Sequence, residues 1–163
     1  MKWNKQFDYP KSVRSLVKGH RHYEIDASSL PSVTTIISQT QDQEKIESLA
    51  KWKAKVGEKE AENIKNVAAL RGTAMHEYLE HYIAGKELLD LTETGVKAKS
   101  MAKTIIEQGL PDLEEIWGSE VTVYYPGLYA GATDLCGIYM GRDSIIDFKQ
   151  SNKPKRAEWI TDY

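Results

Sequence analysis

The pattern of hydrophobic and polar positions divides the chain into a helical part and a following sheet. Through most of residues 31–110, apolar side chains recur three and four positions apart, which is the spacing of one buried helix face. After Pro111 they recur at every second position, as in Val121, Val123 and Tyr125, which is typical of a half-buried strand. The expected helices are 33–38, 44–55, 58–70, 74–84 and 94–108.

Residues that favour helix ends set these boundaries. Ser32 is a suitable N-cap for the first helix. Residues 71–73, which include a glycine, separate the third helix from the fourth, and the Gly-Leu-Pro sequence at 109–111 ends the last helix. Residues 1–30 show no clear period, and we expect them to be irregular apart from a short strand or hairpin around residues 22–25.

Two further strands and a turn are expected in the last third of the chain. Residues 135–140 form an apolar run that begins directly after Asp134, and residues 144–148 form a second run. Residues 141–143, with the sequence Gly-Arg-Asp, lie between the runs and have the composition of a hairpin turn. Together with the strand that contains Val121, these two strands make a three-stranded antiparallel meander.

The predicted hairpin brings charged side chains together. Neighbouring side chains on a strand alternate between its faces, so Asp147 and Lys149 share one face while Phe148 points to the other. Folding about the turn places Asp134 opposite, or nearly opposite, the Asp147–Lys149 pair. Charges near a core are costly unless they are paired or bind a metal, and two carboxylates repel one another. The hairpin therefore predicts a divalent-cation site, for which Glu120 on the preceding strand is a further candidate ligand.

The order of the elements predicts one α+β domain, with N-terminal helices followed by the antiparallel meander. A chain of 163 residues can form one core of ordinary size, and no internal repeat or long linker divides it. Within residues 1–163 we expect an irregular segment (1–30), a helical part (31–110), and a catalytic sheet with the start of the next helix near Lys155 (115–163).

Composition and charge exclude several classes of protein. The formal net charge of −2 and the pI near 6.1 are not those of a protein that coats nucleic acid, although local clusters of lysine and arginine are compatible with a basic groove. The single cysteine, Cys136, excludes an internal disulfide and a cysteine-bound iron–sulfur cluster. No apolar run is long enough to cross a membrane, and no signal peptide is visible. We therefore expect a reducing, cytoplasmic setting, and a mitochondrial location stays open.

His76 invites comparison with zinc proteases, because a second histidine follows it on the same predicted helix. The metalloprotease motif needs two histidines four positions apart, so that both lie on one helix face. His76 and His81 are five positions apart, which is about 140° round a helix. The spacing excludes a zinc protease.

Five short motifs occur in order along the chain. They are Leu30-Pro31-Ser32-Val33-Thr34, Trp52 before Gly57, Arg71-Gly72-Thr73-x-x-His76, Gly131-x-x-Asp134, and Asp147-x-Lys149-x-Ser151-x-Lys153-Pro154. Together they resemble the PD-(D/E)XK nuclease superfamily in its RecB-like exonuclease branch, and in particular the mitochondrial genome maintenance exonuclease family and its bacteriophage relatives. The resemblance runs from about residue 30 to the end of the chain.

The resemblance implies a restriction-endonuclease-like core and a metal-dependent deoxyribonuclease, an exonuclease that favours single-stranded DNA ends. The ligands that it implies for Mg²⁺ or Mn²⁺ are His76, Asp134, Asp147 and the main-chain carbonyl of Phe148. Oxygen ligands suit these hard cations, and one imidazole shifts the tolerance toward manganese. Lys149 would orient or activate the attacking water, with Asp134 and Asp147 as the other catalytic residues.

The same resemblance implies contacts to DNA and a biological setting. The residues that it assigns to the DNA backbone are Ser32, Thr34, Arg71 and Lys153. A role in DNA repair, in recombination or in the degradation of host DNA would follow, in the cytoplasm of a bacterium or of a phage-infected host.

Two departures from the family pattern leave alternatives open. Gln150 stands where the family usually has threonine. The family's next helix carries a tyrosine and then a glutamine, and Tyr163 would be the first residue of that element. For a complete chain we therefore expect a core truncated at its C-terminus, completed by a partner chain or by self-association. The alternatives are a catalytically incomplete nuclease-fold module that binds DNA or a partner chain, a structure-specific endonuclease of the same fold, and an α+β protein whose hairpin acids are only surface charges.

Overall fold

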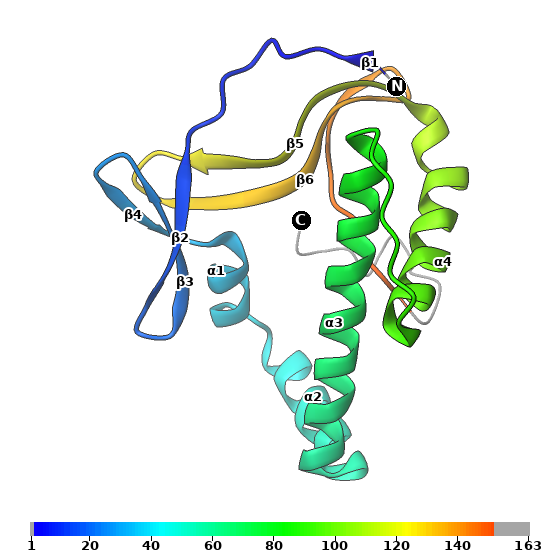
Figure 1. Cartoon of the computed structure of the whole chain (residues 1–163). Coiled ribbons are helices and arrows are strands. Elements are labelled where there is room, and N and C mark those ends of the chain that lie inside the picture. Colours follow the sequence, from blue (N-terminus) through cyan, green and yellow to red (C-terminus); the bar gives the residue numbers. More distant parts are fainter. Residues whose placement is uncertain (1, 152–163) are drawn as a thin grey trace. The chain divides into compact units, whose positions relative to one another are not determined.

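The computed structural model describes residues 2–151, which form four α-helices and two sheets (Figure 1). The helices are α1 (Val33–Gln39), α2 (Gln43–Val56), α3 (Glu58–Ile83) and α4 (Glu93–Gln108), with a short 3-10 turn at Leu110–Asp112. The strands are β1 (Lys2–Trp3), β2 (Ser12–Val17), β3 (His20–Ile25), β4 (Ser28–Pro31), β5 (Leu113–Tyr125), β6 (Tyr129–Tyr139) and β7 (Arg142–Ile146). This content confirms the predicted α+β class.

The described chain forms two compact units. The first unit comprises residues 2–41 and 111–147, and the second comprises residues 42–110 and 148–151. The chain therefore passes from one unit to the other between Asp147 and Phe148. That both units belong to a single domain stays a prediction.

The first unit contains a four-stranded sheet in the order β1-β5-β6-β7. β5, β6 and β7 form the antiparallel meander that the alternating pattern predicted, and β1 pairs parallel to β5 at the edge. The β6–β7 turn consists of Met140 and Gly141, whose φ angles of 50° and 71° match a two-residue turn that follows the strand twist. The turn thus lies earlier than the predicted 141–143, and β7 ends two residues before the predicted limit at Phe148.

The N-terminal segment is more regular than its sequence predicts. The strand expected around residues 22–25 is confirmed as β3, but the expectation that the rest of the segment is irregular is wrong, because β2, β3 and β4 form a three-stranded antiparallel sheet. Left-handed residues at Lys18, Gly19 and Asp26, with φ angles of 52°, 82° and 52°, make the tight turns between these strands. The strand pattern is hidden in the sequence because β2 exposes its apolar side chains: Val13 is 67% exposed and Leu16 is 76% exposed.

The first unit is held together by a small buried cluster between its sheets. Tyr23 and Ile25 of β3 and Leu30 of β4 pack with Ala130 of β6, and all four side chains are nearly inaccessible to solvent. Burial of large apolar side chains stabilises by roughly 1.5–3 kcal/mol each. This cluster therefore fixes the N-terminal sheet against β6.

The second unit contains the long helix α3, which runs without interruption through residues 71–73. The prediction of two helices divided at this point is therefore wrong. Gly72 inside the helix costs roughly 1 kcal/mol relative to alanine. Gly72 does not end the helix but lets the Gln150 side chain approach it closely. A Cβ at this position would lie 3.0 Å from Nε2 of Gln150. Met75 and Leu79 are fully buried, and α3 packs against α4.

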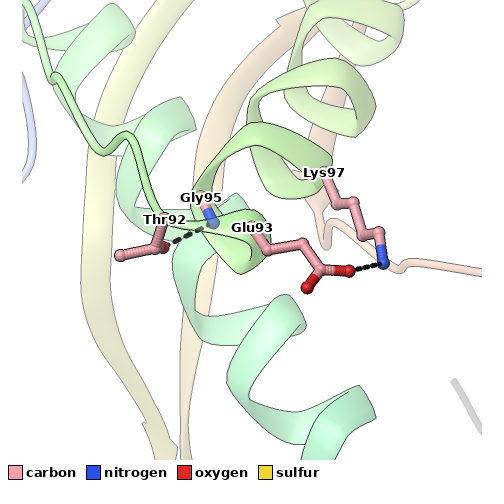
Figure 2. Close-up of polar contacts among 4 residues, drawn as sticks. All are labelled: Thr92, Glu93, Gly95 and Lys97. Carbon is pink, nitrogen blue, oxygen red and sulfur yellow. Dashed lines mark hydrogen bonds and ion pairs between the residues drawn. The ribbon is translucent and has the colours of Figure 1, made fainter.

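Figure 2 shows how α4 begins. Thr92 is the N-cap, and its hydroxyl oxygen accepts a 3.0 Å hydrogen bond from the Gly95 amide. Glu93 and Lys97 form a 2.6 Å ion pair one turn apart, but both side chains are exposed, so the pair contributes little. The Asp90 carboxylate accepts a hydrogen bond from the Thr92 amide and lies so close to Gly95 that an added Cβ would meet its carboxyl carbon at 2.2 Å.

The other helices agree with the predicted ranges to within one or two residues. Among the described residues, no helix has the length and apolarity needed to cross a membrane. The helix expected near Lys155 and the predicted DNA contact Lys153 lie outside the described residues.

Candidate metal site

Glu120 on β5 and Asp134 on β6 form a pair of carboxylates in the first unit. The β5–β6 register, which pairs Ser119 with Leu135, places Glu120 and Asp134 opposite each other. Candidate ligand oxygens of the two carboxylates lie within 4.8 Å of one another. Two oxygens bound to one hard cation at about 2.1–2.6 Å can be separated by up to about 5 Å. The pair therefore fits a shared divalent cation.

The backbone of Glu120 is left-handed inside a strand, with φ at 53°. For a residue with a Cβ this conformation costs about 1–2 kcal/mol. Such strain persists only where the surrounding structure enforces it, and it is concentrated at functional sites. The backbone therefore marks Glu120 as a candidate functional residue independently of its charge.

Asp134 is half-buried and lies between two buried residues of β6, Thr133 and Leu135. The Thr133 hydroxyl shares its hydrogen bond between two carbonyl oxygens, that of Leu135 at 3.0 Å and that of Ile146 at 3.2 Å. Because Ile146 is the last residue of β7, this hydroxyl joins the backbone beside Asp134 to the end of the neighbouring strand.

Asp147 follows β7 directly and is exposed. The β6–β7 ladder ends with Leu135 opposite Ile146, and the next pair in the same antiparallel register is Asp134 and Asp147. The juxtaposition of Asp147 with Asp134 stays a prediction, because Asp147 lies one residue beyond the last pair of the ladder. Since the strand ends before Phe148, the alternation of strand side chains does not determine the direction of Lys149.

The segment after Asp147 belongs to the second unit and lies on α3. The Phe148 side chain is 7% exposed, and its ring meets the His76 imidazole edge to face, with ring centroids 6.3 Å apart. His76 is half-buried, whereas Lys149 is exposed. The imidazole of His76 therefore contacts Phe148, the residue that follows Asp147 in the chain.

Gln150 is held on α3 by both ends of its side-chain amide. Its Nε2 donates to the Ala68 carbonyl, and its Oε1 accepts a 2.6 Å hydrogen bond from Nε of Arg71. From the sequence, Gln150 is only a departure from the family pattern. The feature of the sequence that could have predicted this contact is Gly72, because an isolated glycine within a helical pattern is often there to let another segment pack closely.

The residues predicted to contact DNA have different surroundings. Ser32 is 2% exposed, and its hydroxyl accepts a 3.0 Å hydrogen bond from the Thr35 amide as the N-cap of α1. Thr34 is exposed on the first turn of α1. Arg71 is half-buried beside Gln150. Ser32 therefore has a structural task in α1, whereas Thr34 is accessible to a ligand.

A cleft of about 610 Å³ lies beside Glu120 in the first unit. Tyr9 and Arg14 line one side, and Glu120 and Thr122 of β5 line the other. The Ser12 and Thr122 hydroxyls, 2.6 Å apart and 110 positions apart in the chain, hold the two sides together. Burial raises the pKa of the Tyr9 phenol, so this side chain stays neutral at physiological pH. The cleft has the volume of a small-ligand pocket, and sequence patterns could not find it because its walls are distant in the chain.

Comparison with known proteins indicates a relationship to an exonuclease. Over 131 residues the chain is 28% identical to mitochondrial genome maintenance exonuclease 1 of Homo sapiens, and the aligned region covers 77% of this chain and 38% of that protein. Over 138 residues it is 30% identical to the Mus musculus protein of the same name, and the aligned region covers 80% of this chain and 40% of that protein. The chain spans about two-fifths of the length of these curated relatives. No protein-family model matches the chain.

Proposed function

We propose that this protein is a metal-dependent DNA exonuclease that hydrolyses phosphodiester bonds, with a preference for single-stranded ends. The observation that carries the proposal is the pair Glu120 and Asp134, whose candidate ligand oxygens lie within 4.8 Å of one another on β5 and β6. The next strand of the same sheet, β7, leads into Asp147-x-Lys149. The similarity to two proteins named exonucleases supports it independently. Membership of the PD-(D/E)XK superfamily and its RecB-like branch belongs to the same proposal.

The proposed metal ligands are His76, Asp134, Asp147 and the Phe148 carbonyl, joined by Glu120. Support for His76 comes from its ring contact with Phe148, which is bonded to Asp147. Support for Asp147 comes from its place directly after β7, whose last residue, Ile146, pairs with Leu135, the residue after Asp134. The imidazole of His76 and the carboxylates of Glu120 and Asp134 offer one nitrogen and several oxygens, a donor set that suits Mn²⁺ or Mg²⁺.

The chain's own residues would orient the reacting groups. When bound, the divalent cation would lower the pKa of a water molecule and stabilise the charge that develops on the phosphate. Asp134 and Asp147 would accept hydrogen bonds from the attacking water and direct it in line with the leaving oxygen. The Lys149 ammonium would hydrogen-bond the water or a phosphate oxygen and offset its negative charge. Arg14, in the cleft beside Glu120, would supply a second positive charge to the phosphate backbone.

The preference for single-stranded ends and the biological setting extend the proposal. The cleft beside Glu120, at about 610 Å³, offers space for a terminal nucleotide, and Thr34 is accessible for contact with the backbone. Degradation or repair of DNA in the cytoplasm of a bacterium or a phage-infected host would use such an activity. A structure-specific endonuclease and a catalytically incomplete module that binds DNA or a partner chain are the competing functions.

The experiment that tests the proposal is digestion of end-labelled single-stranded DNA with Mg²⁺ or Mn²⁺. Asp147→Ala is expected to abolish metal-dependent shortening, and Lys149→Ala is expected to leave only a small residual rate that is measurable at high enzyme concentration. Two exposed residues provide matched controls, Asp143→Ala on the same hairpin and Lys103→Ala on α4, and both are expected to keep wild-type activity.

Substrate topology separates the competing functions. An exonuclease leaves circular single-stranded DNA intact, whereas cleavage of the circle would show an endonuclease. Metal-dependent stabilisation without cleavage of any substrate would overturn the exonuclease and favour the incomplete module, because a ligand that binds only the folded state raises its stability by mass action. Activity that is equal in the site variants and their controls would refute the assigned site.

A further inference from the structure

We propose that Gln150 and Arg71 are positioning residues that fix the backbone of Lys149 on α3. The proposal rests on the proposed function, in which Lys149 acts on the attacking water or the phosphate. It assigns Arg71 a task within the chain, in place of the contact with DNA that its sequence motif suggests.

The contacts of Gln150 are those of an anchor. The donation from Nε2 to the Ala68 carbonyl uses a backbone oxygen of α3, and the 2.6 Å hydrogen bond from Arg71 Nε to Oε1 has a charged donor. Hydrogen bonds with an ionised partner are shorter and roughly twice as strong as neutral ones. The two bonds hold opposite ends of one planar amide, so they fix its orientation as well as its position.

Gly72 makes this anchor sterically feasible. A Cβ at position 72 would lie 3.0 Å from Nε2 of Gln150, which is closer than ordinary van der Waals contact. A glycine in the middle of a 26-residue helix is unfavourable for the helix itself. The helix therefore accepts a local cost at the point where the Gln150 amide lies against it.

Lys149 has an anchored neighbour on each side. Phe148 precedes it, is 7% exposed and packs on the His76 ring. Gln150 follows it and is bonded to α3. Lys149 itself is exposed and lies beyond the end of β7. The two flanking anchors fix the point from which its flexible side chain extends.

The function of such an anchor is to limit where the ammonium can go. A lysine side chain has several rotatable bonds, and movement of its backbone is transmitted to the ammonium. A displacement of about 1 Å in a reacting group can lower the rate by about 100-fold. Loss of the anchor should therefore lower kcat and leave the affinity for DNA nearly unchanged.

The test compares Gln150→Leu and Arg71→Met, which remove the two partners, with Gln108→Leu as the control on an exposed position of α4. Gln150→Leu and Arg71→Met are each expected to lower kcat by about 10- to 100-fold, while KM for a single-stranded oligonucleotide stays within about twofold. Adding Arg71→Met to Gln150→Leu is expected to cause little further loss, because Arg71→Met breaks one of the two hydrogen bonds that Gln150→Leu already removes.

A second cycle shows whether the effect passes through Lys149. In a Lys149→Ala background, Gln150→Leu is expected to cause no further loss, since the group that it positions is absent. An equal loss in both backgrounds would overturn the proposal in favour of a general structural role. A rise in KM for Arg71→Met without a matching effect of Gln150→Leu would also overturn it, because Arg71 would then contact DNA directly.

The anchor is also measurable without catalysis. Hydrogen exchange of the backbone amides of residues 149–151 is expected to accelerate at least about tenfold in Gln150→Leu and to stay unchanged in Gln108→Leu. A wild-type chain without nuclease activity, combined with faster exchange in the variant, would refute the proposed function and leave the anchor in place. Unchanged exchange would refute the anchor itself.

Discussion

Replacement of Glu120 separates the strain at the carboxylate pair from its capacity to bind metal. The φ angle of 53° costs a residue with a Cβ about 1–2 kcal/mol. Glycine removes this cost, although its greater freedom in the unfolded chain returns about 0.5–1 kcal/mol. The net conformational gain for Glu120→Gly is therefore roughly 0–1.5 kcal/mol.

Charge repulsion adds a second term. Two unit charges at 4 Å repel by about 1 kcal/mol in water, and the candidate ligand oxygens of Glu120 and Asp134 lie within 4.8 Å of each other. Glu120→Gln removes the repulsion and keeps the backbone strain, whereas Glu120→Gly removes both. Without metal we expect Glu120→Gly to be the most stable protein, by roughly 1–2.5 kcal/mol over the wild type, and Glu120→Gln to lie between them.

Urea unfolding in EDTA and in excess Mn²⁺ measures both effects. At 100 times its Kd, a bound ion stabilises the folded state by about 2.7 kcal/mol. The wild type should gain this amount, and the two variants should gain less. The difference in free energy of unfolding between the variants and the wild type should therefore shrink or change sign when metal is added. Ser119→Gly is the matched control, because Ser119 precedes Glu120 on β5 and has no left-handed backbone. Its glycine is expected to destabilise by about 0.5–1 kcal/mol.

Two results would refute the reasoning. If Glu120→Gly destabilises the protein in EDTA as much as Ser119→Gly does, the left-handed backbone stores no strain at this position. If Mn²⁺ stabilises the wild type and both variants equally, Glu120 is not a metal ligand, whatever the role of Asp134.

Three further predictions concern the fold that supports the site. Thr92→Ala removes the N-cap of α4 and should lower the free energy of unfolding by about 1 kcal/mol in urea titrations followed by circular dichroism; an unchanged midpoint would contradict the capping role. Gly137→Ala would place a Cβ 2.0 Å from the carbonyl oxygen of Glu115 on the neighbouring strand, so a loss of about 3 kcal/mol or more, or failure to fold, is expected. Hydrogen bonds from the side chains of Asn4 and Trp117 hold the pKa of Glu115 below its ordinary value of 4.5. This stabilisation is present above pH 4.5 and is lost as the pH falls through the lowered pKa of Glu115. Glu115→Gln should therefore make the free energy of unfolding depend less on pH in the acid range. An unchanged pH dependence would contradict the assignment.

The sequence by itself determined those features that depend on neighbouring residues. Alternation with a period of two predicted the β5–β6–β7 meander, and apolar spacing of three to four predicted the helices, because these periods report which face of a single element is buried. Local chemistry also found the N-cap at Ser32, since a serine and the amide three residues later suffice to make it. The same local reasoning selected Asp134, Asp147 and Lys149 as a site.

Local patterns failed where a distant segment decides the conformation. Gly72 predicts a break in a helix, but the helix continues through it, and Gln150, 78 positions further along the chain, lies against that glycine. The strands of the N-terminal segment are weakly patterned because β2 exposes apolar side chains, and their order depends on packing of β3 and β4 against Ala130.

The tertiary structure alone determined the geometry of the candidate site. The cleft between residues 9–14 and β5 follows from contacts between segments about 110 positions apart. The hydrogen bond from Arg71 to Gln150 spans 79 positions. Such contacts form only when chain folding brings the segments together, and their energies outweigh the local preferences of a glycine in a helix or a glutamate in a strand. The sequence therefore determined which residues could do the chemistry, and the packing of distant segments decided how they are held.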